Sequence, residues 1–252
     1  MGVPVEFDLD LLNWKQQDKM RGQYIKYPWR LHASFARGLC WWLKEPGRRR
    51  EGFPSWSWSG WKGELLEWFA FETLDKQEDP EVRFEVAVEG NEELTDLGAL
   101  YKNTPRGKSL DISYTCDTLD VEAWSFAMRI VPKPLEECNR FAPRICPSYY
   151  TGRVELKSGK IMYSDIYLLD QDFSKNHRDL GTQNWTCLVL AYRKQASRSP
   201  VAIVIKEDSE IAERVGLVDF WVSWETDESG KRSQGIFDDR AVEKRRWRGR
   251  LR

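Results

Sequence analysis

The stretch Pro54-Ser55-Trp56-Ser57-Trp58-Ser59-Gly60-Trp61-Lys62-Gly63 places three tryptophans within six residues. Its serines alternate with the first two tryptophans, and a period of two is the spacing of a β-strand. We therefore predict a strand that carries Trp56 and Trp58 on one face and the serines on the other. A β-bulge at Gly60 would return Trp61 to the tryptophan face. The proline lacks a backbone donor and suits the first position of this strand.

Tryptophans at this density are expected to form a core. Each buried tryptophan removes roughly 150–250 Å² from water. At about 25 cal/mol per Å² this burial stabilises the fold by roughly 4–6 kcal/mol before any cost is deducted, as an upper bound. The alternative interpretation is an exposed aromatic platform that binds a carbohydrate or a nucleotide.

Length and composition place the chain among globular proteins. It has 252 residues, of which 41% are hydrophobic and 31% charged, enough for one large core or two small ones. The net charge of -1 gives the whole chain no attraction for polyanions. No apolar run approaches the roughly 20 residues that cross a membrane, and the N-terminal residues lack the pattern of a signal peptide. We expect a cytoplasmic protein with no membrane contact.

Short apolar runs separated by turn residues predict a mainly β fold, an antiparallel β-sandwich or a barrel-like structure with a few short helices. The clearest run is 82–88, in which apolar and polar residues alternate. A short helix is expected at 207–215, and the polar stretch 91–108 is the expected internal boundary. Further strands are predicted at 39–43, 65–73, 119–130, 152–156, 160–169, 187–192, 201–205 and 216–222.

Three segments follow from this pattern: an N-terminal segment 1–97 that packs on the rest, a β-rich domain 109–225, and a disordered basic tail 226–252. The tail gathers Lys244, Arg245, Arg246 and Arg248, with Trp247 among them. A solvated tail is the simplest interpretation. A nuclear-localisation or nucleic-acid patch is the alternative, although we expect no nucleic-acid partner.

No catalytic motif emerges from the residue types that carry chemistry. The histidines are His32 and His177, neither of them within a nucleophile elbow. Five widely spaced cysteines form no C-x₂-C pair, which predicts buried thiols and no metal site. We therefore predict a protein that is not an enzyme and needs no cofactor. Arg214 is expected to be structural, pairing with a carbonyl or a carboxylate.

The tryptophan run also resembles a known family. Phe53 to Gly63 is similar to the segment that follows the signature domain of fungal heterokaryon-incompatibility (HET) domain proteins, with serine at position 59 where alanine is usual. The basic stretch 48–53 and the apolar stretch 38–42 before it fit the same pattern. A second match is Ala212-Glu213-Arg214-Val215-Gly216-Leu217, followed by the aromatic stretch 220–224. The resemblance spans roughly residues 30–225.

The resemblance implies a role and a set of structural residues. The family's signature domain opens with an "LSYxWG"-like strand and a "WIDxLCIxQ"-like helix start, and neither occurs here. The chain is therefore expected to be a non-enzymatic accessory region, acting with protein partners or with a signalling domain in self/non-self recognition. The motif residues expected to be structural are Pro54, Ser55, Trp56, Ser57, Trp58, Gly60, Trp61, Gly63, Arg214 and Gly216.

Overall fold

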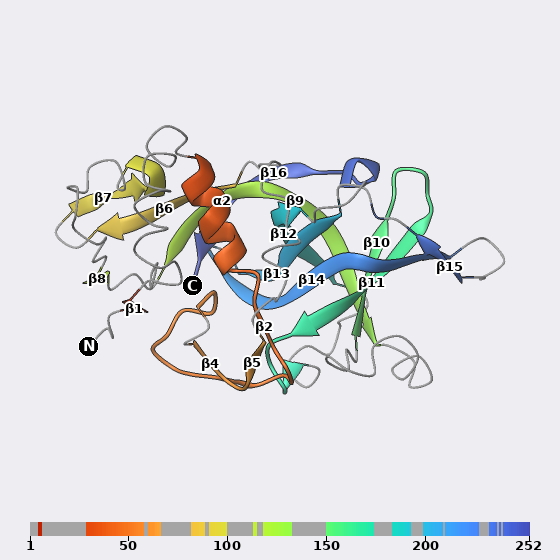
Figure 1. Ribbon diagram of the computed structural model, residues 1–252, viewed down its shortest axis with the longest axis horizontal. Coiled ribbons are helices and arrows are strands. Elements are labelled where there is room, and N and C mark those ends of the chain that lie inside the picture. The colour runs from red at the N-terminus through yellow and green to blue at the C-terminus, as the bar shows by residue number, and fades with distance from the viewer. Residues whose placement is uncertain are drawn as a thin grey trace, which may run out of the picture.

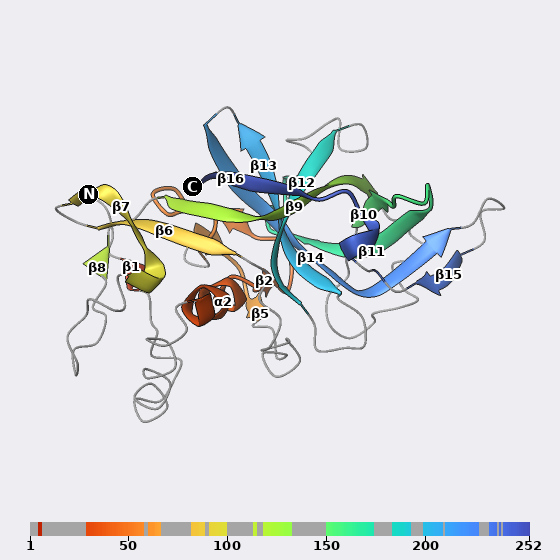
Figure 2. The same cartoon turned by 90° about the horizontal axis from the view of Figure 1, so that it is seen from above.

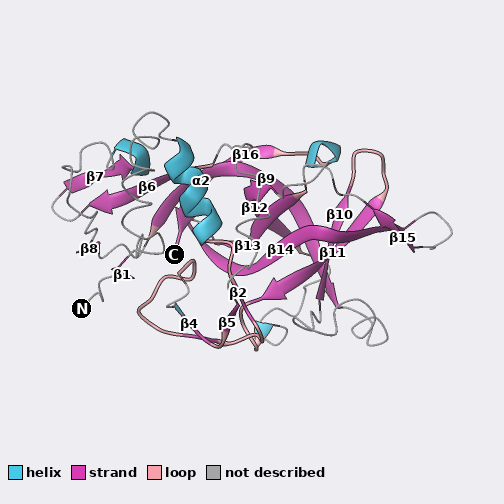
Figure 3. Ribbon diagram, in the orientation of Figure 1, coloured by secondary structure: helices cyan, strands magenta, loops and turns pink. Residues whose placement is uncertain are grey.

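The computed structural model of the chain describes residues 5–6, 29–57, 60–66, 82–88, 91–99, 113–114, 118–132, 150–173, 183–192, 199–208, 210–226, 232–235, 237 and 239–252. Within these ranges strands predominate, and the helices are α2 (Trp29–Gly38), a 3-10 helix η3 (Asp239–Ala241) and shorter helical turns (Figure 1, Figure 3). The predicted mainly β, antiparallel fold is confirmed.

The strands are short in the first half of the chain and longer in the second. The first eight are β1 (Val5–Glu6), β2 (Trp42–Leu43), β3 (Arg48–Arg49), β4 (Trp61–Lys62), β5 (Leu65–Leu66), β6 (Arg83–Val88), β7 (Asn91–Asp96) and β8 (Ser113–Tyr114). The later ones are β9 (Leu119–Pro132), β10 (Tyr150–Glu155), β11 (Ile161–Leu168), β12 (Asn184–Tyr192), β13 (Pro200–Asp208), β14 (Ile211–Thr226), β15 (Arg232–Gly235) and β16 (Arg245–Leu251).

Six of the long strands close into a ring. Antiparallel pairing runs from β9 to β12, β13, β14, β11 and β10, and β10 pairs again with β9. The ring is possible because β9 is long: residues 125–129 pair with β12 on one edge, and residues 129–132 pair with β10 on the other. The sheet is therefore a closed antiparallel barrel, one of the two predicted architectures (Figure 1).

β12 and β13 are buried on both faces. Along β13, Ala202 and Val204 belong to one core cluster, while Val201, Ile203 and Ile205 belong to another. The first cluster draws residues from all six ring strands and so fills the barrel. The second lies on the opposite face of β12 and β13. It is covered by α2, which lies along one side of the sheet near β6 (Figure 2).

The C-terminal segment is a strand, so the prediction of a disordered tail over 226–252 is wrong. β16 pairs antiparallel with residues 119–125 of β9 and parallel with residues 211–212 of β14. β16 therefore bridges β9 and β14, as the β10–β11 hairpin does at other residues of the same two strands. Trp247 and Leu251, four residues apart, share one face of the strand and are buried. High charge suggested disorder, but Arg246, Arg248 and Arg250 occupy the opposite face and Arg245 is exposed at the start of the strand.

Elements of all three predicted segments belong to one ten-stranded sheet. β6 pairs with β9 through residues 83–85, with the predicted alternation: Val82, Phe84 and Val86 are buried. The expected boundary at 91–108 begins instead with β7, which forms a hairpin with β6. A strand suits residues 91–96 because the hairpin partner satisfies their backbone groups.

Two helical assignments differ from the sequence prediction. The helix expected at 207–215 is absent, because β13 and β14 continue through these residues as a hairpin with Asp208 opposite Ile211. The strand expected at 39–43 is limited to β2 and follows α2, which the sequence analysis missed. Ala33 and Ala36 recur at helical spacing on its buried face.

Candidate functional site

The tryptophan run is a set of turns and not the predicted strand. Residues 51–57 form turns and bends, and regular strand resumes only at β4. The N–H of Ser57 donates to the Pro54 carbonyl (3.3 Å), and the N–H of Gly60 donates to the Ser57 carbonyl (3.0 Å). Serine, proline and glycine favour such local bonding, which outweighs the alternation. Trp58 and Ser59, and with them the expected bulge, lie outside the described residues.

The burial predicted for the run holds, although its geometry does not. Trp56 is 2% exposed and Trp61 7% exposed. Ser55 and Ser57 are buried as well, so serines and tryptophans do not separate to opposite faces.

Gly60 and Gly216 stand where backbones meet closely. A Cβ at Gly60 would lie 2.3 Å from the Pro54 carbonyl oxygen and 2.5 Å from Nη1 of Arg49. A Cβ at Gly216 would lie 2.8 Å from the Tyr167 carbonyl oxygen. Both sites therefore exclude a side chain without a backbone shift.

Ser55 connects the run to two distant strands. Its hydroxyl accepts a hydrogen bond from the backbone N–H of Arg214 on β14 (2.9 Å) and donates to the main-chain oxygen of Arg252. Its carbonyl accepts from Nε1 of Trp61 (3.0 Å). Arg252 in turn donates its N–H to the Ala212 carbonyl (2.9 Å). One buried serine thus joins the run, β14 and the end of β16.

Arg214 is 1% exposed and packs against Trp41. Its guanidinium stacks on Trp41 at 4.0 Å from the ring centroid and donates through Nη2 to the Trp41 carbonyl, as the predicted structural role requires. In the described part of the chain, its Nε and Nη1 have no hydrogen-bond partner. Burial lowers the pKa of Arg214 to about 9, with Cys40 acting in the opposite direction.

A second arginine secures the other side of the run. Arg49 on β3 donates to the carbonyls of Gly60 (3.0 Å) and Phe53, and its guanidinium lies 5.5 Å from the ring centroid of Trp61. Burial also lowers its pKa, and Glu213 raises it. We call the five residues Trp41, Arg49, Ser55, Trp61 and Arg214 the Ser55 junction. Sequence reasoning singled out three of them; Trp41 and Arg49 carry no local signal of their role.

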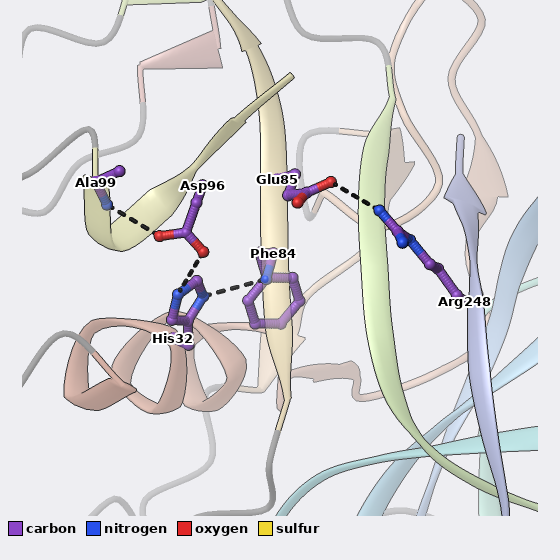
Figure 4. A network of polar contacts seen from close by, with 6 residues as sticks. All are labelled: His32, Phe84, Glu85, Asp96, Ala99 and Arg248. Carbon is purple, nitrogen blue, oxygen red and sulfur yellow. Dashed lines mark hydrogen bonds and ion pairs between the residues drawn. The ribbon is translucent and has the colours of Figure 1, made fainter. Parts of the chain in front are cut away.

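His32 sits in a buried polar network between α2 and the β6–β7 hairpin (Figure 4). Its Nδ1 accepts the backbone N–H of Phe84 (3.1 Å), so its proton is on Nε2, which lies 3.3 Å from Oδ2 of Asp96. The other oxygen of Asp96 accepts the N–H of Ala99 (2.9 Å) and caps the helical turn that begins at residue 97. Both ring nitrogens of His32 are therefore engaged in contacts that hold the hairpin against α2.

The basic residues of β16 form ion pairs with acidic residues of other strands. Nε of Arg246 donates to Oε1 of Glu122 (2.8 Å), and this bond lowers the pKa of Glu122. The other pairs are Arg250 with Asp120 (3.3 Å), Arg245 with Glu207 (3.5 Å) and Arg248 with Glu85 (3.5 Å, Figure 4). Lys244 and Arg246 both lie 5.4 Å from the ring centroid of Trp124. The predicted basic cluster is thus part of a mixed-charge face.

Next to the Ser55 junction lies a hollow of about 480 Å³ on the surface of β3 and β4. Its charged members are Lys44, Glu45, Arg48, Lys62 and Glu64, and its other lining residues are Pro46, Gly47, Gly63 and Gln171. Nζ of Lys44 and Oε2 of Glu64 form an exposed ion pair at 3.0 Å across the hollow.

Other expected sites are placed only in part. Cys40 and Cys187 are buried thiols, and burial raises the pKa of Cys187. His177 and the remaining cysteines lie outside the described residues. Within the described ranges there is no group of three metal-ligating side chains. Over the same ranges no helix has the length and apolar character to cross a bilayer.

The comparisons with known proteins add no relative to this description. No family model matches the chain, and neither the curated proteins nor the solved structures contain a significant match.

Proposed function

We propose that this chain is a non-enzymatic, β-rich accessory region of a protein similar to the HET family, and that it acts by holding or regulating a signalling partner in self/non-self recognition. The observation that carries the proposal is the Ser55 junction. The residues on which the resemblance rests are built into one buried contact between the tryptophan run, β14 and β16. Their role is to shape a scaffold, which suits an accessory region.

Two described residues of the kind that support catalysis, His32 and Ser55, are engaged in the fold. A general base needs a free nitrogen within reach of a nucleophile. His32 instead accepts the Phe84 N–H and donates toward Asp96. Ser55 is 1% exposed, and its hydroxyl both donates and accepts a hydrogen bond within the fold. These contacts favour a scaffold over a hydrolase that uses His32.

A second candidate, a carbohydrate- or nucleotide-binding module, requires exposed tryptophans. Trp41, Trp42, Trp56 and Trp61 are all buried, which favours the accessory region. Trp56→Ala separates the two. A core tryptophan should cost about 3–5 kcal/mol of unfolding free energy, measured by urea denaturation. A platform tryptophan should leave stability unchanged and abolish the quenching of tryptophan fluorescence by glycans or nucleotides.

Co-purification tests the leading proposal. The tagged full chain is expressed in fungal cells and recovered under mild conditions, with Trp56→Ala as the destabilised reference and Lys160→Gln as the matched surface variant. Lys160 is exposed and pairs with Glu225 (2.9 Å), with no contact to the tryptophan run among the described residues. We expect the same protein partner with wild type and Lys160→Gln, and its loss with Trp56→Ala. Recovery of wild-type chain with no partner would contradict the proposal.

A further inference from the structure

Two positive charges face each other across the floor of the hollow. Arg48 on β3 and Lys62 on β4 are directly opposed partners in this short antiparallel pair, and both side chains are exposed. In the described part of the chain, neither forms an ion pair or a side-chain hydrogen bond. Like charges at opposed positions destabilise a strand pair. The arrangement therefore costs stability that a bound anion would recover.

The floor beneath these charges is held rigidly. A Cβ at Gly47 would lie 2.0 Å from the Lys62 carbonyl oxygen, so β4 passes directly against this residue. On its other side, the Gly47 N–H donates to the Leu169 carbonyl (2.7 Å) and its carbonyl accepts the Gln171 N–H (2.9 Å). These contacts fix the backbone next to Arg48 and opposite Lys62, which reduces the ordering cost of binding.

The charge pattern identifies the class of ligand. Lys44 and Glu64 neutralise each other, which leaves Arg48, Lys62 and Glu45 as the other charged residues that line the hollow. Glu45 would repel the second charge of a phosphate group, whereas a carboxylate carries a single charge. The hollow, of about 480 Å³, is open to solvent, as a site for a segment of another chain must be. It accommodates a few residues of an extended peptide.

We propose that the hollow binds an acidic peptide segment of a protein partner, with an aspartate or glutamate side chain between Arg48 and Lys62. The inference rests on the proposed function, because it supplies the docking site of the proposed partner. The guanidinium of Arg48 offers a planar donor pair to the carboxylate, and Lys62 adds a second charge. Glu45 at the edge favours a neutral or basic residue next to the acidic one.

The test is a binding measurement on the purified full chain. A fluorescein-labelled, capped peptide Gly-Asp-Lys-Glu-Gly is titrated by fluorescence anisotropy, against its twin with Asn and Gln in place of Asp and Glu. We expect the acidic peptide to bind, more weakly as salt rises. Arg48→Gln and Lys62→Gln should each weaken binding about tenfold, the loss of one charge-assisted contact. Lys160→Gln is the matched control and should bind as wild type does.

The melting temperature distinguishes a variant that has lost the binding site from one that has lost the fold. Because Lys62→Gln removes a repulsion, its melting temperature should equal or exceed that of wild type while peptide binding falls. Equal binding by wild type and both hollow variants, or equal binding of the acidic peptide and its amide twin, overturns the inference. Displacement of the peptide by inorganic phosphate at a similar concentration also overturns it, because the ligand class would then be a phosphate.

The co-purification experiment distinguishes this inference from the function beneath it. If Arg48→Gln and Lys62→Gln retain the cellular partner at wild-type yield, the docking site is elsewhere and the accessory role stands. If wild type binds the acidic peptide in solution but recovers no partner from cells, the site stands and the accessory role fails.

Discussion

The hydroxyl of Ser55 accepts a hydrogen bond at 2.9 Å from the backbone N–H of Arg214, a residue 159 positions further along the chain. The same hydroxyl donates to the main-chain oxygen of Arg252. Both partners belong to the C-terminal part of the chain, whereas Ser55 lies in the tryptophan run. A single buried side chain therefore closes contacts that the strand ladders alone do not make.

Ser55→Ala should lower the free energy of unfolding by about 1–3 kcal/mol, because it leaves the buried Arg214 N–H without an acceptor. Urea denaturation measures the loss. Ser158→Ala is a suitable control, since that hydroxyl is exposed and accepts only a 3.4 Å contact from Lys160. A Ser55→Ala protein as stable as the control variant would show that the bridge contributes nothing.

The titration of Arg214 should raise the free energy of unfolding as the pH rises above about 9. Its pKa falls from the ordinary value of an arginine in an unfolded chain to about 9 in the fold, because burial disfavours the charge. Between these values the unfolded state binds the extra proton, so stability rises with pH, by up to roughly 1.4 kcal/mol per pH unit. Below pH 9 both states are charged and this pH dependence is lost.

Arg214→Met removes this titration while retaining bulk. From pH 8 to pH 10 the free energy of unfolding of wild type, measured relative to that of the variant, should rise by about 1.4 kcal/mol. Urea denaturation at each pH gives this difference and cancels the titration of other groups. Arg83→Met, at an exposed position, is the reference and should show a flat difference. A flat difference for Arg214→Met as well would contradict the expectation.

Asp96→Asn should lower the free energy of unfolding less than Asp96→Ala does. Asp96→Ala removes the cap on Ala99 and the acceptor for Nε2 of His32, which together should cost about 2–3 kcal/mol. Asp96→Asn keeps a capping oxygen and should cost less than half as much. Urea denaturation compares the two, and hydrogen exchange at the Phe84 amide reports on the bond to His32. Equal losses for both substitutions would assign the stability to the carboxylate charge instead.

The C-terminal strand should carry a large part of the stability. Trp247→Ala removes a buried member of the second core cluster and should cost about 3–5 kcal/mol by urea denaturation. Arg248→Ala, on the exposed face of the same strand, is the matched control and should change stability by no more than about 1 kcal/mol. A disordered tail would make both variants equal to wild type.

Local patterns were sufficient to predict many strands and the burial of the tryptophans. The alternation at 82–88 and the runs at 119–130 and 187–192 are short-range properties of the chain, and the structure has β6, β9 and β12 there. Alternation failed at Ser55-Trp56-Ser57, where serine and glycine bond to nearby backbone groups and form turns. It also missed α2, a helix of ten residues whose buried face carries Ala33 and Ala36 at helical spacing.

The sequence by itself determined that this protein is mainly β and that Trp56 and Trp61 are buried, because side-chain alternation and hydrophobicity act over a few residues. The tertiary structure alone decided the roles of Ser55, Arg214 and β16. A charged segment becomes a strand only where the edge of β9 offers it backbone partners and acidic side chains. A serine becomes a bridge only where two distant backbone groups converge on its hydroxyl.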